Sequence, residues 1–129
     1  MQITDTVQSG DWKQEKHTPV IEIAGNIEKG KPINIKVSVG KEIPHPNKPE
    51  HHIAWIEVYF KPQAEKFPCQ ISRVEFSAHG ASVRTSDAGS IFSEPKAEVF
   101  FKTEKPGTIL ALSYCNIHGL WQNSLEIKF

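Results

Sequence analysis

The segment "PINIKVSV" at residues 32–39 limits the possible folds of this chain more than any other feature of the sequence. Isoleucine or valine stands at every second position from 33 to 39, and asparagine, lysine and serine fill the positions between them. Successive side chains of a β-strand point to opposite faces, so this alternation places the apolar side chains on one face. The segment therefore predicts a strand with one face buried and the other exposed to water.

Seven further segments carry the signature of a short strand bounded by turn residues. Clusters such as "EKGKP", "DAGS" and "EKPGT" separate them, and only the first 17 residues leave room for a short helical turn. Seven or eight short strands with turns between them predict an all-β fold, an immunoglobulin-like antiparallel β-sandwich of about seven strands. The further predicted strands cover residues 20–24, 53–61, 70–77, 81–84, 97–103, 108–114 and 123–129.

The length of 129 residues is typical of one domain, and we expect residues 1–129 to form a single domain. The proline-rich stretch "KEIPHPNKPEHH" is interpreted as a stiff loop between two strands and not as a linker between domains. Fifteen basic and fifteen acidic residues give a formal net charge of +0, without a long run of one sign. This balance argues against a nucleic acid or a membrane surface as partner.

The sequence also predicts a location. No apolar stretch approaches the roughly 18 residues of a membrane span, and the start "MQITDTVQSGDWKQEKH" lacks the apolar region of a signal peptide. We therefore expect a cytoplasmic protein. Its two cysteines, Cys69 and Cys115, do not make a disulfide framework and are expected as free thiols, with Cys69 semi-buried and without a role.

The stretch "SYCNIHGLW" places Cys115 and His118 three residues apart, where the apolar run "TILALSYC" ends. Loops at one end of a sandwich can converge on a single point, and most of the six histidines are expected in loops or at strand ends. His51 and His52 are adjacent at the start of a strand, so their side chains should point to opposite sides and only one can be a ligand. The candidate donors are His17, His45, His51 or His52, Cys115 and His118.

The number and kind of donors favour iron among the metals considered. Structural zinc takes four ligands, usually with two or more cysteines, although one thiolate with three imidazoles would still permit it. Five donors, four nitrogens and one sulfur, suit a square pyramid with an open sixth position, which is a geometry for redox-active iron. A cupredoxin-like copper electron carrier is the main alternative. Its site takes two histidines, one cysteine and a weak axial ligand, and here only Met1 or Gln122 is available for that place.

The motifs "EKHTP", "HPNKPEHH" and "SYCNIHGLW" together resemble those of the superoxide reductases, specifically the one-iron neelaredoxin type within the desulfoferrodoxin family. The resemblance runs through nearly the whole chain. It implies one mononuclear Fe²⁺/Fe³⁺ centre per chain, and it matches Glu15 and Lys16 to the pair that precedes the first ligand. His52 and His79 match no ligand. The implied ligands are His17, His45, His51 and His118 as four equatorial imidazoles and Cys115 as the axial thiolate.

The same resemblance implies the reaction, in which superoxide, one electron and two protons give hydrogen peroxide. The electron is expected from a separate protein, a rubredoxin or a similar donor, and family members are often tetramers or dimers. Lys16 is expected to attract the superoxide anion and to help deliver a proton. Glu15 is expected to occupy the sixth position in the resting ferric state and to leave it on reduction. Trp121 is expected to shield the metal from water.

Overall fold

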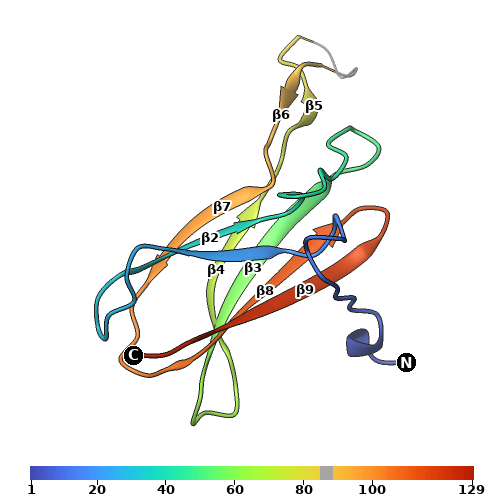
Figure 1. Ribbon diagram of the computed structural model, residues 1–129. Helices are drawn as coiled ribbons and strands as arrows, with labels where there is room; N and C mark the ends of the chain where they lie inside the picture. Colours follow the sequence, from blue (N-terminus) through green and yellow to red (C-terminus); the bar gives the residue numbers. More distant parts are fainter. Residues whose placement is uncertain (85–88) are drawn as a thin grey trace.

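The computed structural model describes residues 1–84 and 89–129, and strands make up nearly all of its regular structure (Figure 1). One short 3-10 helix, η1 (Ile3–Asp5), precedes them, in the region where the sequence allows a helical turn. Within these two described ranges no helix is long and apolar enough to cross a membrane. The strands are β1 (Val20–Ala24), β2 (Ile33–Ser38), β3 (Ile53–Pro62), β4 (Cys69–Glu75), β5 (His79–Ala81), β6 (Ile91–Phe92), β7 (Lys96–Phe101), β8 (Gly107–Cys115) and β9 (Gly119–Ile127).

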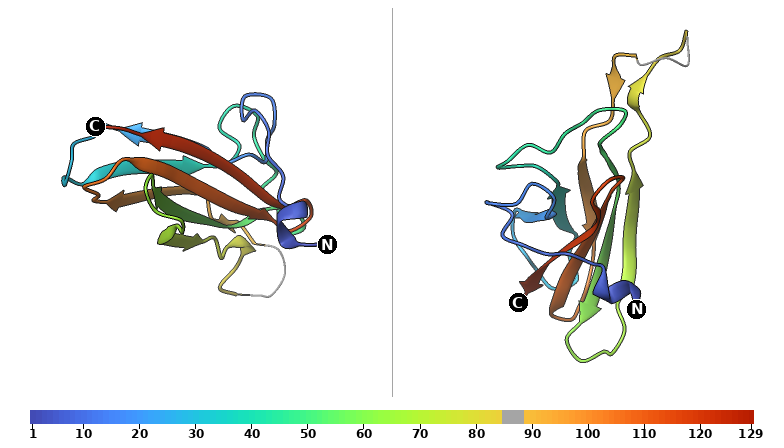
Figure 2. Two further views of the ribbon diagram at one scale, coloured as in Figure 1. Left: turned by 90° about the horizontal axis from the view of Figure 1, so that it is seen from below. Right: turned by 90° about the vertical axis from the view of Figure 1, so that its right-hand side faces the viewer.

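Seven of these strands form two antiparallel sheets that face each other (Figure 2). One sheet has the order β1-β2-β7, and the other has the order β4-β3-β8-β9. A division into three and four strands with crossovers between the sheets is typical of immunoglobulin-like sandwiches. The predicted all-β sandwich is therefore confirmed.

The alternation that predicts β2 also explains its packing. Ile33, Ile35 and Val37 are each 0 % exposed, while the residues between them face outward or are only partly covered. From the opposite sheet, Ile56 and Ile109 are also 0 % exposed and belong to the same core cluster. Burial of each such side chain contributes roughly 1.5–3 kcal/mol, so the two inner faces hold the sheets together. The core gives the loops at its ends a rigid base.

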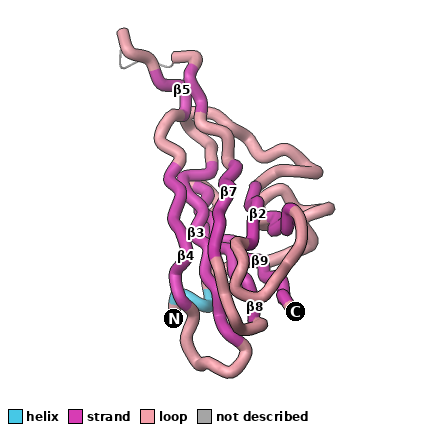
Figure 3. Tube along the Cα trace, turned by 90° about the vertical axis from the view of Figure 1, so that its left-hand side faces the viewer, coloured by secondary structure: helices cyan, strands magenta, loops and turns pink. Residues whose placement is uncertain are grey.

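The strand predictions fail around the β5–β6 hairpin. The predicted strand at residues 81–84 is wrong, because β5 ends at Ala81 and residues 82–84 leave the ladder. Strand β6 is absent from the prediction, and the turn cluster "DAGS" lies partly outside the described residues. The hairpin extends away from the two sheets (Figures 1 and 3). Without a core against which to alternate, its sequence carries no clear strand period.

Two smaller predictions also need correction. Strand β9 begins at Gly119, earlier than the predicted start at residue 123, and Cys69 is exposed at the start of β4 instead of semi-buried. Gly119 has φ +82°, a conformation that glycine adopts at little cost, and it pairs directly with Cys115. Because this turn is tight, β9 begins at Gly119, only four residues after β8 ends at Cys115.

Strand register brings three loops to one end of the sandwich. Val20 pairs with Ser38, so the chain before β1 lies beside the chain that follows β2. Ile53 pairs with Cys115, so the end of the β2–β3 loop lies beside the β8–β9 turn. These three segments carry the candidate ligands from both sheets.

Candidate metal centre

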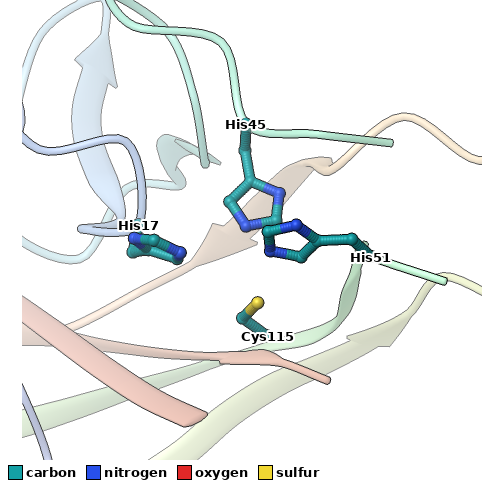
Figure 4. Close-up of side chains that lie close together, drawn as sticks. All are labelled: His17, His45, His51 and Cys115. Carbon is teal, nitrogen blue, oxygen red and sulfur yellow. The ribbon is translucent and has the colours of Figure 1, made fainter. Parts of the chain in front are cut away.

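Four of the predicted donors converge at this end of the sandwich. One ligand atom from each of His17, His45, His51 and Cys115 lies within 4.8 Å of the others. Figure 4 shows the three rings and the sulfur pointing toward one another. His17 precedes β1, the other two histidines belong to the β2–β3 loop, and the cysteine ends β8. Residues separated by nearly the whole chain therefore share one site.

The imidazole of His45 has one nitrogen that a metal ion would satisfy. Its Nδ1–H donates to the carbonyl oxygen of Pro46 at 2.6 Å, which leaves Nε2 with the lone pair. The residue is only 8 % exposed. In the described part of the chain, Nε2 of His45 and Nε2 of His51 are both buried and lack a hydrogen-bond partner. An unpaired buried polar atom costs about 1–3 kcal/mol, so a metal bound between these nitrogens fits the residues present.

Cys115 provides a fixed sulfur at the base of the cluster. The residue is 0 % exposed, and its backbone pairs with Ile53 on one side and Gly119 on the other. Its Sγ accepts a hydrogen bond from the backbone N–H of His118 at 3.4 Å, as the turn after a strand end allows. One thiolate together with several imidazoles is a donor set for a transition metal such as iron, copper or zinc.

His118 lies beside the four-residue cluster. Its Nδ1 is 3.1 Å from Nε2 of His17 and 3.9 Å from Sγ of Cys115. Its ring centroid is 5.0 Å from that of His51, and the residue as a whole is exposed. The ring therefore closes the solvent side of the cluster with Nδ1 turned toward the other donors.

Glu15 contacts the far side of a predicted ligand. Its Oε1 accepts a hydrogen bond from Nδ1 of His17 at 2.6 Å and another from the backbone N–H of the same residue at 3.1 Å. Burial acts to raise the pKa of Glu15, but the hydrogen bonds and charge of His17 outweigh it, and the pKa is lowered. The carboxylate thus fixes the tautomer of His17 that turns Nε2 toward the cluster.

Lys16 places a positive charge near the same cluster. Burial is the largest cause that lowers the pKa of both His45 and His51, and the charge of Lys16 lowers both further. The side chain is partly buried. Its field therefore reaches the rings that line the site.

His52 and His79 lie outside the cluster, stacked on each other with ring centroids 3.5 Å apart and an interplanar angle of 7°. Nδ1 of His52 donates to the carbonyl oxygen of Lys48 at 3.0 Å, and Nε2 of His79 donates to that of Phe76 at 2.5 Å. Of the adjacent pair, which directly precedes β3, His51 therefore points to the cluster and His52 points away, as the sequence predicts.

Two residues that the ligand argument does not use hold the ligands in place. The indole of Trp121 stacks on the His17 ring at 4.8 Å and 15°, and its Nε1–H donates to the carbonyl oxygen of His118 at 3.2 Å. From the sequence, Trp121 is expected only to shield the metal from water. No role is predicted for the side chain of Asn116, although a short polar side chain directly after Cys115 in a tight turn is a recognisable signal.

The buried His45 makes the stability of the metal-free protein depend on pH. Burial lowers its pKa to about 4 from an ordinary 6.5, against the opposing hydrogen bond to Pro46. Between these values the unfolded chain binds more protons, so the free energy of unfolding falls as the pH drops from 6.5 to 4. We expect a loss of up to about 3 kcal/mol from this group. Urea unfolding at several pH values measures it, and a wild-type slope equal to that of His45→Gln would contradict it.

Comparisons with known proteins agree with this geometry. The family model described as Desulfoferrodoxin matches residues 9–124. A superoxide reductase of Pyrococcus furiosus is 52% identical over 98% of this chain and 99% of its own, and the neelaredoxin of Megalodesulfovibrio gigas is 42% identical over 98% of each. The solved structure of a reduced superoxide reductase (neelaredoxin) from Archaeoglobus fulgidus superposes with a TM-score of 0.87 at 52% identity, covering 96% of this chain and 99% of that one. The chain therefore belongs to the desulfoferrodoxin family.

Proposed function

We propose that this chain is a superoxide reductase, which converts superoxide, one electron and two protons into hydrogen peroxide. The observation that carries the proposal is the convergence of three imidazoles and the Cys115 sulfur within 4.8 Å, with two buried nitrogens left for a metal. Its family membership and the named activity of its relatives support the same reaction. One iron per chain is proposed, with His17, His45, His51, His118 and Cys115 as the ligands.

Bound iron would supply the single electron that superoxide receives. A separate donor protein would then return an electron to the iron. The buried Cys115 thiolate would hold the metal and donate electron density to it, while Trp121 covers the ring of His17. A blue-copper site takes two histidines, one cysteine and a weak axial ligand. The third converging imidazole therefore favours iron over the cupredoxin-like alternative. Gln122, the substitute axial ligand, is exposed on β9.

The test measures both products of the reaction. The reduced protein is mixed with superoxide from a pulse source, and hydrogen peroxide and oxygen are quantified together. A reductase yields one peroxide per superoxide without oxygen, whereas dismutation releases oxygen as well. Metal analysis with a visible spectrum adds a second criterion: iron with colour that bleaches on reduction supports the proposal, and copper or colourless zinc opposes it.

We expect Lys16→Ala to slow the second-order reaction with superoxide by several-fold, up to about tenfold. The chain carries no net charge, so a local positive charge must draw in the anion, and Lys16 already acts on His45 and His51. The rate in the variant should also depend less on ionic strength, because less attraction remains to be screened. Stopped-flow or pulse radiolysis at several salt concentrations measures both effects, and Lys36→Ala on the outer part of β2 is a matched control.

Glu15 is proposed to act at a different step. Its carboxylate would leave His17 and take the sixth position of the resting ferric state, a hard oxygen donor on a hard ion. Glu15→Ala should then alter the resting spectrum with little change in the first encounter with superoxide. A rate that collapses in Glu15→Ala but stays unchanged in Lys16→Ala would refute this division of roles.

The remaining proposals concern the setting of the reaction. We propose that residues 1–129 act as one domain, which the continuous core between the two sheets supports. We also propose a rubredoxin or a similar protein as electron donor and a dimer or tetramer as the assembly. A cytoplasmic location is proposed because both cysteines are free and a reducing compartment preserves the thiolate.

A further inference from the structure

Asn116 connects two of the loops that carry candidate ligands. It directly follows Cys115 at the end of β8, and its side chain reaches the end of the β2–β3 loop. Its Oδ1 accepts a hydrogen bond from the backbone N–H of His52 at 2.8 Å, and its Nδ2 donates to the carbonyl oxygen of Glu50 at 3.0 Å. The backbone N–H of Asn116 donates to the carbonyl oxygen of His52 at 3.2 Å.

These three hydrogen bonds bracket His51. The residues that Asn116 binds, Glu50 and His52, stand immediately before and after it, so the peptide units on both sides of His51 are tied to the turn that follows Cys115. The described structure also orders this segment through the small bridge between Lys48 and His51 and through the hydrogen bond from Nδ1 of His52 to the carbonyl oxygen of Lys48. A loop of this kind has few contacts of its own that could hold a side chain in one direction.

We propose that Asn116 is a positioning residue, which sets the distance between the His51 imidazole and the Cys115 sulfur before any metal arrives. The hydrogen bonds of Asn116 join two candidate metal ligands. Asn116 is the neighbour of Cys115 in the chain, and its partners Glu50 and His52 are the neighbours of His51. Groups that orient ligands typically change metal affinity by about 10 to 100-fold when they are removed. The inference rests on the proposed metal centre. It goes beyond that centre, because it gives a role to a residue that contacts neither the metal nor the substrate.

The experiment measures Co²⁺ binding to the metal-free protein by the thiolate-to-cobalt absorption band and by chelator competition. We expect Asn116→Ala to weaken Co²⁺ binding by about 10 to 100-fold and to shift the thiolate band, because the nitrogen of His51 moves relative to the sulfur. Asn116→Asp keeps the acceptor for His52 but loses the donor to Glu50, so it should fall between wild type and alanine. Asn34→Ala is the matched control, since that amide bonds to Glu98 on the outer side of the other sheet.

A double-mutant cycle separates positioning from general destabilisation. If Asn116 acts through His51, then Asn116→Ala in a His51→Ala background should weaken Co²⁺ binding little further. Additive losses, or an Asn116→Ala affinity and band equal to those of Asn34→Ala, would overturn the proposal. A wild-type protein that fails to bind Co²⁺ would instead overturn the metal centre and this inference with it, so the two failures are distinguishable.

Discussion

Cys115→Ser should remove the visible absorption of the iron-loaded protein and lower its superoxide reductase activity by at least about 100-fold. The substitution exchanges a soft, electron-rich thiolate for a poor oxygen donor at a position that is 0 % exposed. Three imidazoles remain within reach of the metal, so iron content should fall less than activity. Metal analysis, the visible spectrum and peroxide yield from pulsed superoxide are measured on the same sample.

Cys69→Ser is the matched control for this prediction. Cys69 is an exposed free thiol at the start of β4, in the strand at the edge of the four-stranded sheet. The same chemical change there should leave colour, iron content and activity near wild type. Retention of colour and activity in Cys115→Ser would show that the sulfur does not bind the metal.

The sequence predicts the fold best where one face of a strand meets the core. The alternation at residues 33–39 gives β2, and its inward residues are the most deeply buried in the sheet. The same signal fails at β5 and β6, since Ile91 and Phe92 are exposed and stand on a hairpin away from the core. Binary patterning reports burial, and a strand that buries neither face leaves no such pattern.

The candidate site is also predicted only in part. The sequence predicts which residues are ligands, but it does not predict the hydrogen bonds that orient them. The rule that adjacent side chains of a strand point to opposite sides predicts that only one of His51 and His52 is a ligand, and the structure has His51 in the cluster. The contacts of Glu15 with His17 and of Asn116 with the neighbours of His51 depend on loop paths in three dimensions. No period or spacing encodes such a path, so these hydrogen bonds are seen only in the structure.

Loss of any single imidazole ligand should weaken metal binding far more than loss of either remaining histidine. His17→Ala, His45→Ala, His51→Ala and His118→Ala should each lower iron affinity by about 100-fold or more, because removal of a ligand exceeds the 10 to 100-fold typical of its supporting groups. His45→Ala and His51→Ala also remove buried nitrogens that otherwise lack a partner among the described residues. Iron retention against a chelator and peroxide yield measure the series.

His52→Ala and His79→Ala are the internal controls, because these two rings stack on each other outside the cluster and bind backbone carbonyl oxygens. Each should change iron affinity by no more than about threefold, the scale of a substitution away from the site. The outcome for His118→Ala decides the fifth ligand, since Nδ1 of His118 lies 3.1 Å from Nε2 of His17. An iron affinity of His118→Ala close to that of the controls would leave a centre with four ligands. Loss of iron in His52→Ala, with retention in His51→Ala, would show that His52 and not His51 is the ligand.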